Sequence, residues 1–223
     1  MNDDTFVSVW QYGAVEDLQQ PDAGAPLAVR TVEDVEILRA LADPTRLAIL
    51  SVLMERRDDL PVLSVKELAA RLGEPQTKLY RHMKQLEATG LIRVAATRLV
   101  SGILEQRYQA SQRDLHFDGS FIRAHADESE VALNTFLDSF RTGFFAALRD
   151  ERLAPDRVED AERYRLPTMS YSEARVSPAR ATQIRDRLKE VMALIDDKEA
   201  EDPAGVLVNV LIGYYASTEP GQA

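Results

Sequence analysis

The chain has 223 residues, of which 45% are hydrophobic and 29% are charged. This length allows one large or two modest domains, and the composition is that of a globular protein rather than of a disordered chain. Because the sequence contains no cysteine, it excludes disulfide scaffolds, thiolate zinc sites and cysteine nucleophiles.

Neither end of the sequence predicts export or membrane insertion. Asp3 and Asp4 stand where a secretory signal needs positive charge. The longest apolar run, about Val206 to Ala216, is interrupted by Asn209 and is shorter than the roughly 20 residues that span a bilayer. We therefore expect a cytoplasmic protein that has no membrane partner.

Charge is distributed unevenly along the chain, whose net charge is −10. Residues 64–113 hold nine basic and four acidic side chains, whereas residues 1–63 and 114–223 are both net acidic. Phosphate affinity depends on clustered Lys and Arg. This pattern predicts a nucleic-acid-binding module joined to an acidic remainder, which would suppress indiscriminate binding.

Residues 1–30 are acidic and contain several Gly and Pro residues, which predicts a loose N-terminal arm. Its apolar residues, including Phe6, Trp10 and Tyr12, are expected to dock on the folded part of the protein rather than to form a functional aromatic site.

Helical signals become dense after Thr31. Val35, Leu38 and Leu41 predict a first helix that stops before Asp43-Pro44. Asp43 is placed to cap a second helix with Pro44 at its first position. The inward stripe of that helix is predicted at Leu47, Leu50 and Leu53.

The sequence LSVKELAARLG predicts the next helix most clearly. Ser64 and Glu67 have the spacing of a capping box, and Leu63 and Leu68 that of a hydrophobic staple. Gly73 suits the left-handed residue that follows the last turn.

A further helix is predicted to open at Pro75 and to end at Gly90. Two short helices joined by a turn that contains Gly form a helix-turn-helix. The segments LIRVAATR and LEQRYQA then predict a hairpin that turns around Leu99 to Gly102. That order of elements is a winged helix.

The helix within residues 76–89 has a core side at Leu79, Met83 and Leu86 and an outer side rich in bases and hydroxyls. Arg and Gln can read base edges in a major groove, while Lys and Tyr can contact phosphates. A solvated helix face is the alternative. The predicted DNA contacts on this helix are Gln76, Thr77, Lys78, Tyr80, Arg81, Lys84 and Gln85.

Other candidate residues lie outside this set. Arg98, near the hairpin tip, and Arg107, on the return strand, are further candidates for DNA contact, although the side to which Arg107 points is left open. His82 is expected to be a partly buried structural histidine. His116 and His125 could form at most a two-histidine pair, a weak metal signature, so we predict no metal site and no cofactor.

Three strings resemble the ArsR-type winged-helix transcriptional regulators: LADPTRLAIL, SVKELAARLGEPQTKLYRHMKQLEATGLIRV and TRLVSGILEQRYQAS. The last resembles the extended wing of a subgroup with a longer C-terminal region. The resemblance covers Val32 to about Asp118 and implies a homodimeric DNA-binding repressor or activator. Five residues match recognition-helix positions: Thr77, Lys78, Tyr80, Arg81 and Lys84.

The sequence also departs from that family. Metal-sensing members carry a cysteine pair on the helix that is SVKELAARL here, where this chain has Val65 and Lys66. Thiolate sensing of metals is therefore not carried over.

In the second half, residues Phe121 to Arg149 predict one long helix. Its apolar stripe, assigned to core packing or a dimer seam, comprises Leu133, Phe136, Leu137, Phe140, Phe144 and Leu148. A β-α-β unit is predicted next. It has a strand at TMSYSEARV, a helix capped by Ser177-Pro178, and a strand at VLVNVLIGYYAS. The helix is expected to face inward through Ile184, Leu188, Val191 and Leu194 or Ile195.

Two roles for this half remain open. It could be a dimerisation and effector domain with an apolar pocket between the Phe136 to Phe145 stripe and Tyr214 and Tyr215. Alternatively, it is purely architectural and sets the spacing of two recognition helices.

The predicted fold class is mainly α with small β elements. An arm (1–30) is followed by a winged helix-turn-helix domain (31–117) and a C-terminal α+β dimerisation or effector domain (118–223). The predicted function is sequence-specific transcription regulation by a homodimer bound to double-stranded DNA. The helix at 76–89 would lie in the major groove, and the wing at 91–110 on flanking backbone or minor groove.

A protein-interaction module on the same scaffold is the alternative, and no catalytic constellation predicts an enzyme.

Overall fold

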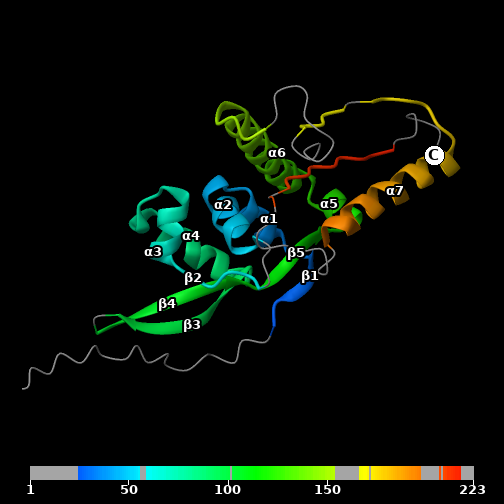
Figure 1. Ribbon diagram of the computed structural model, residues 1–223. Coiled ribbons are helices and arrows are strands. Elements are labelled where there is room, and N and C mark those ends of the chain that lie inside the picture. Colours follow the sequence, from blue (N-terminus) through cyan, green and yellow to red (C-terminus); the bar gives the residue numbers. More distant parts are fainter. Residues whose placement is uncertain are drawn as a thin grey trace, which may run out of the picture.

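The computed structural model describes residues 25–55, 59–100, 102–153, 166–170, 172–196, 206 and 208–216 (Figure 1). These residues form seven helices and two small sheets. The elements are β1 (Leu27–Val32), α1 (Val35–Leu41), α2 (Pro44–Leu53), β2 (Leu63–Ser64), α3 (Val65–Leu72), α4 (Gln76–Ala88), β3 (Ile92–Val100), β4 (Ile103–Ala110), β5 (Gln112–Phe117), α5 (Gly119–Ala124), α6 (Ala126–Arg149) and α7 (Pro178–Asp196).

The helix starts predicted from capping residues are confirmed. The Asp43 carboxylate accepts from the Arg46 amide at 2.9 Å, and Pro44 opens α2. Ser64 and Glu67 form the predicted capping box at the start of α3, and Gly73 adopts the left-handed conformation, with φ of 66°, at its end. These local bonds satisfy amides and carbonyls that a helix end otherwise leaves free.

Helices α1 to α4 enclose the hydrophobic core together with β2 and the first residues of β3. Its largest fully buried side chains are Leu38, Leu41, Ile49, Leu50, Leu53, Leu60, Leu68, Leu79, Met83, Leu86, Leu91 and Ile92. All three predicted core residues of α4 are among them. This packing fixes which side of α4 remains outside.

Strands β3 and β4 form the predicted hairpin directly after α4, with β2 on the other edge of β4. The strands are longer than predicted and extend to Val100 and Ile103, with Gly102 (φ 80°) in the turn. Figure 1 shows the hairpin projecting from the helices.

A second sheet was not predicted. Strand β1 runs parallel to β5, with Leu27 opposite Gln112 and Val32 opposite Phe117. The folded part therefore begins inside the range assigned to the arm, and residues 27–30 are a strand rather than loose chain. The arm residues Phe6, Trp10 and Tyr12 lie outside the described residues.

The predicted single helix from Phe121 to Arg149 is wrong in one respect: it is divided into α5 and α6. His125 has φ −126° and ψ 52°, which is not helical, so the chain turns there. Asp118 caps α5 by accepting from the Ser120 and Phe121 amides. Helix α6 begins anew at Ala126, with four charged or polar residues in a row and acidic side chains in its first turn.

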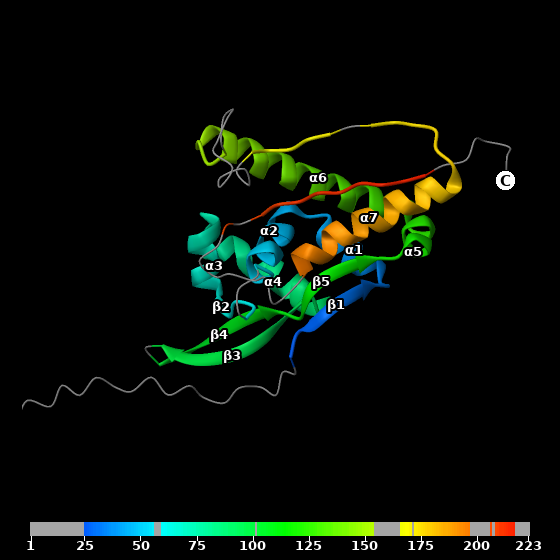
Figure 2. The same ribbon diagram turned by 45° about the vertical axis from the view of Figure 1, so that its right-hand side comes forward.

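The prediction of a β-α-β unit is also wrong. Helix α7 is present, and the Ser177 hydroxyl caps it by accepting from the Arg180 amide. However, residues 172–177 and 208–216 have no regular secondary structure. Figure 2 shows these two segments running separately, so neither supplies the ladder partner that a strand requires.

The predicted inward stripe of α7 does not face a core. Ile184 is 37% exposed and Val191 45%, Leu194 is also exposed, and only Leu188 among the described residues of the stripe is partly buried. The side chain of Ile195, together with Leu207 and Tyr171 of the two predicted strands, lies outside the described part of the chain.

Candidate nucleic-acid interface

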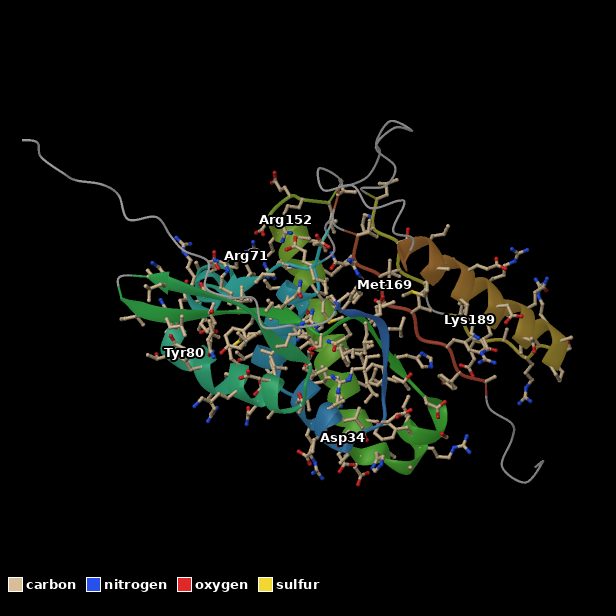
Figure 3. The ribbon with its side chains drawn as sticks, turned by 90° about the horizontal axis from the view of Figure 1, so that it is seen from below. Asp34, Arg71, Tyr80, Arg152, Met169 and Lys189 are labelled. Atoms are coloured by element: carbon tan, nitrogen blue, oxygen red, sulfur yellow. The ribbon has the colours of Figure 1, made fainter. Side chains whose placement is uncertain are left out.

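Helix α4 presents the predicted polar side chains to solvent. Gln76, Thr77, Lys78, Tyr80, Arg81, Lys84 and Gln85 are all exposed. The same helix buries its opposite side completely at Leu79 and Leu86. The structure therefore brings these seven residues together on one face, as the helical period of the sequence predicted. Figure 3 shows Tyr80 beside the hairpin, across the molecule from Lys189 of α7.

Arg46, a residue that the sequence reasoning missed, connects α4 to two other helices. Its Nε donates to the Ala40 carbonyl at 2.7 Å, and its Nη2 donates to the Arg39 carbonyl at 2.7 Å. Its Nη1 donates to Gln85 Oε1 at 2.7 Å. One guanidinium on α2 thus ties the end of α1 to the exposed face of α4. The sequence places Arg46 in the first turn of α2, but this position does not indicate which groups Arg46 contacts.

Arg30, assigned to the arm, supports the other end of α4. Its guanidinium donates to the carbonyls of Gly90 at 2.6 Å and Thr89 at 3.0 Å. Cations favour the carbonyl end of a helix. Arg30 was missed because nothing in the local sequence indicated that β1 pairs with β5.

His82 is buried between α4 and α2, with 4% of its surface exposed, as predicted for a structural histidine. Its Nδ1 lies 3.4 Å from Asp43 Oδ1. Burial lowers the pKa of His82, and the positive charges of Arg81 and Arg46 act in the same direction, while Asp43 opposes them. A neutral, buried His82 is a packing residue and does not face a ligand.

Two of the exposed polar residues already have partners. Lys78 donates to Glu74 at 2.7 Å, an exposed pair whose net stabilisation is small. The side-chain carbonyl oxygen of Gln85 accepts a hydrogen bond from Arg46. A phosphate could therefore compete for Lys78 at little cost, but Gln85 retains only its amide donors.

The two predicted hairpin arginines lie in different surroundings. Arg107 points back at the body of the protein, donating to the Val62 carbonyl at 2.7 Å and lying 3.3 Å from Glu67 Oε2. Arg98 is partly exposed and stands opposite Glu105 in the strand register. Its Nε is buried without a hydrogen-bond partner among the described residues.

Glu67 connects the hairpin to the start of α3. Partial burial alone would raise the pKa of Glu67, but hydrogen bonds from Ser64 and the charge of Arg107 outweigh burial and leave that pKa lowered. The carboxylate therefore stays ionised and holds both the helix cap and the hairpin arginine. This arrangement fixes the base of the hairpin next to α3.

The hairpin tip is apolar, which the sequence reasoning did not notice. Val100 pairs with Ile103 and Leu99 with Leu104 across the turn. All four side chains are exposed, Ile103 by 72%. The tip of the hairpin therefore presents an apolar surface rather than a basic one.

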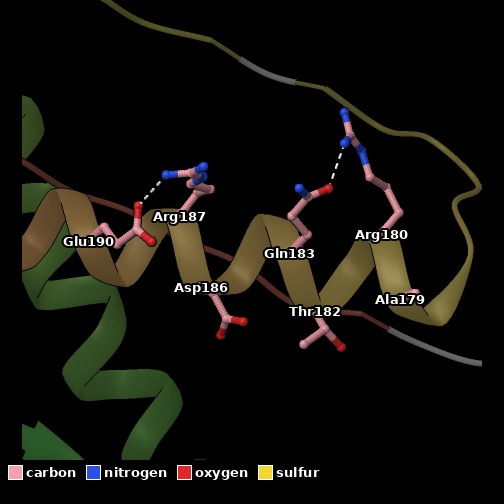
Figure 4. Close-up of a pocket in the computed structure, with 7 residues that line it drawn as sticks. All are labelled: Ala179, Arg180, Thr182, Gln183, Asp186, Arg187 and Glu190. Atoms are coloured by element: carbon pink, nitrogen blue, oxygen red, sulfur yellow. Dashed lines mark hydrogen bonds and ion pairs between the residues drawn. The ribbon is translucent and has the colours of Figure 1, made fainter.

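The described structure supports neither a metal site nor a ligand site on α7. No group of three or more His, Cys, Asp or Glu side chains within it could hold a metal ion. The hollow in Figure 4 is lined by α7 alone, and its side chains pair with each other, Arg180 with Gln183 and Arg187 with Glu190. One helix face cannot enclose a ligand.

The effector pocket predicted beside Tyr214 and Tyr215 also lacks support. Tyr215 is 89% exposed and therefore lines no enclosed space. The Tyr214 hydroxyl donates to the Ala181 carbonyl of α7 at 3.0 Å.

A comparison with protein families gives the class of this site. Residues 41–95 match the family model of a helix-turn-helix domain, and they run from the last residue of α1 into β3. The chain therefore carries a helix-turn-helix domain of the kind found in transcription regulators. No curated protein matches the chain. Within the described residues, no helix is long and apolar enough to cross a membrane.

Proposed function

We propose that this protein is a homodimeric, sequence-specific transcription regulator of the ArsR type, without metal-sensing cysteines. Helix α4 enters the major groove, and the β3–β4 hairpin is a wing that lies on the flanking backbone or minor groove. One observation carries the proposal: α4 exposes seven polar side chains on one face while its other face is locked into the core.

Arg81 and Lys84 carry most of the proposed DNA contact. Both side chains are exposed and lie near the middle of the polar face of α4. Arg81 suits a bidentate contact to a guanine edge. Gln76, Thr77, Tyr80 and Lys84 are placed for backbone contacts or base contacts beside it, and Lys78 can exchange Glu74 for a phosphate.

The remaining candidates have more limited roles. Gln85 can only donate while Arg46 holds its oxygen, so it is a weaker candidate for adenine, whose bidentate recognition needs both amide atoms. Arg107 stabilises the base of the wing through Val62 and Glu67. Arg98, nearer the apolar tip, is the wing cation available for DNA.

Dimerisation is supported by α6. This helix turns Ala132 and Phe136 toward the core, whereas Leu137 and Leu148, next to that face, are exposed. Monomers rarely leave such a stripe uncovered. A symmetric pair of chains joined through α6 would present two α4 helices to half-sites about 34 Å apart, one turn of DNA.

The experiment is to retain fragmented genomic DNA on the purified full-length protein at physiological salt and to sequence it. We expect enrichment of a few fragments that share an inverted repeat. Arg81→Ala should then weaken binding to that operator by about 1 to 3 kcal/mol, and Lys84→Ala should reduce the salt slope by about one if Lys84 contacts phosphate.

Arg187→Ala on α7 is the matched control, since it removes an exposed arginine from the far side of the molecule. Equal operator affinity of Arg81→Ala, Lys84→Ala and wild type would remove α4 from the interface. The apolar wing tip favours one alternative, a protein-interaction module, and recovery of a protein partner without any DNA selection would support that alternative.

A further inference from the structure

An apolar pocket that is open to solvent on one side lies between the helix-turn-helix domain and α6. Its volume is 460 Å³, within the usual range for small-molecule sites. It is lined by α1, the end of β5, α5 and α6. Leu38 of α1 and Ala132 of α6 form buried walls, and the rings of Phe117 and Phe136 meet edge to face with centroids 6.0 Å apart.

The few polar groups around this pocket are placed at its edge and wall. Arg123 and Glu130 lie at exposed lining positions, one on α5 and one on α6. The Ser129 hydroxyl, also in the lining, is buried and has no hydrogen-bond partner in the described part of the chain. A buried hydroxyl without a partner is unfavourable, and a polar group of a ligand would satisfy it after a rotation about its side chain.

We propose that this pocket binds a small molecule with an apolar body and a single polar end, and that its occupancy changes the affinity for DNA. The binding claim stands by itself, whereas the regulatory claim rests on the proposed function. The expected ligand places its apolar body between Leu38 and Phe136 and its polar end near Ser129 or Arg123.

The contacts between α6 and α4 provide the physical route for such regulation. Helix α6 is held against α1 by Thr135, which donates to the Ala42 carbonyl at 3.1 Å, and by Glu128, which accepts from Arg39 at 3.0 Å. The end of α1 is tied to Gln85 of α4 through Arg46. A ligand that moves α1 relative to α6 therefore moves a support of the DNA-contacting face.

Calorimetric titration of the full-length protein with 1-decanol and with decanoate tests the binding claim. We expect saturable binding of about one probe per chain. Tighter binding of decanoate would assign Arg123 to the polar end, and tighter binding of 1-decanol would assign Ser129. Either preference supports the site. Absence of saturable binding by both probes would overturn the proposed ligand site. The apolar walls would then be assigned to contact with a second copy of the chain.

Ala126→Trp is the variant designed to fill the pocket, because Ala126 is an exposed lining residue of α6. It should weaken probe binding at least tenfold, whereas Ala124→Trp, on exposed α5 but outside the lining, should not. Leu133→Gln, which replaces a half-exposed wall residue, provides a second test if Ala126→Trp does not fold. Probe binding that neither pocket variant weakens would contradict the assignment.

The regulatory claim is tested on the operator. A saturating probe should change operator affinity by about fivefold or more, and the operator should change probe affinity by the same factor. Arg46→Lys keeps the charge, but its single nitrogen cannot reach the three acceptors that the three guanidinium nitrogens contact, so it should reduce this coupling while the probe still binds. Equal operator affinity with and without bound probe would overturn regulation. Failure of the proposed function is distinguishable, since no operator is then selected although probe binding is still measurable.

Discussion

Helices α4 and α7 both carry an aliphatic stripe at helical spacing, but only one of these stripes is covered. In α4, Leu79 and Leu86 are completely buried against α2 and α3. In α7, Ile184 and Val191 keep 37% and 45% of their surface exposed. Similar periodicity therefore has two different structural outcomes.

The difference lies in what surrounds each helix. Helix α4 follows α3 after a short turn and is contacted by side chains of two other elements: Arg30 of β1, and Arg46 and the capping Asp43 of α2. Helix α7 accepts a hydrogen bond from Tyr214 at its Ala181 carbonyl, but within the described residues its aliphatic stripe stays largely exposed. An amphipathic pattern specifies a helix and a preferred face, but it does not specify the element that covers this face. We expect the chain to cover the exposed stripes when it dimerises.

The largest effect is expected when one residue of each stripe is truncated and the two losses of stability are compared. Leu79→Ala should lower the free energy of unfolding by about 2 to 5 kcal/mol, because it leaves a cavity in a packed core. Ile184→Ala should lower it by much less, because its side chain is already partly in water. Urea unfolding of both variants at low protein concentration measures the contrast. A similar loss in both would show that α7 is packed in the monomer.

The predictable features are those governed by local sequence. The capping box at Ser64, the Asp43 cap and the buried face of α4 depend on residues within one or two turns, and each is present as predicted. The seven exposed polar residues of α4 follow from the same period. This is why the candidate interface could be placed from the sequence alone.

The features that could not be predicted depend on distant partners. Strand β1 forms because β5, some 80 residues later, lies beside it, and Arg30 reaches Gly90 only as a result. Conversely, the alternating segment at 208–216 has the composition of a strand but has no ladder partner among the described residues. The break at His125 is a third case, because no Gly or Pro near His125 marks it in the sequence.

The second prediction concerns the exposed stripe of α6. Leu137→Asp places a charge in the middle of this stripe, so we expect the dimer dissociation constant to rise tenfold or more. Sedimentation velocity over a concentration series measures the change. Asp138→Asn, at an adjacent position whose partner is Arg141 on the same helix, is the control. An unchanged dimer in Leu137→Asp would place the seam elsewhere.

A smaller effect is expected at the start of α3. Ser64→Ala removes the acceptor for the Glu67 amide and half of the capping box, so it should cost about 1 kcal/mol of stability. Thermal unfolding checks the value. Because Glu67 also holds Arg107, the wing should loosen as well, seen as faster amide exchange in β4 than in β1. Ser177→Ala, which removes the cap of the uncovered α7, should change global stability less.

The smallest expected effect is a pH dependence of stability that arises from His82 on α4. Burial keeps the pKa of His82 below its ordinary value of about 6.5. Since the unfolded chain takes up the proton first, the stabilisation is fully present above that ordinary pKa and is lost as pH falls toward the lowered pKa of the folded state. The groups that face His82 are Asp43 and Arg46 from α2 and Arg81 and Lys78 from its own helix.

Urea unfolding between pH 7.5 and 5.5 should therefore show falling stability in the wild type and a flatter profile in His82→Gln. The carboxylates with lowered pKa values, Glu67, Asp118 and Glu128, lose their contribution only at more acidic pH, so they do not produce this slope. His116→Gln, an exposed position on β5, should keep the wild-type profile. If His82→Gln retains the full slope, burial against α2 is not what couples this helix to pH.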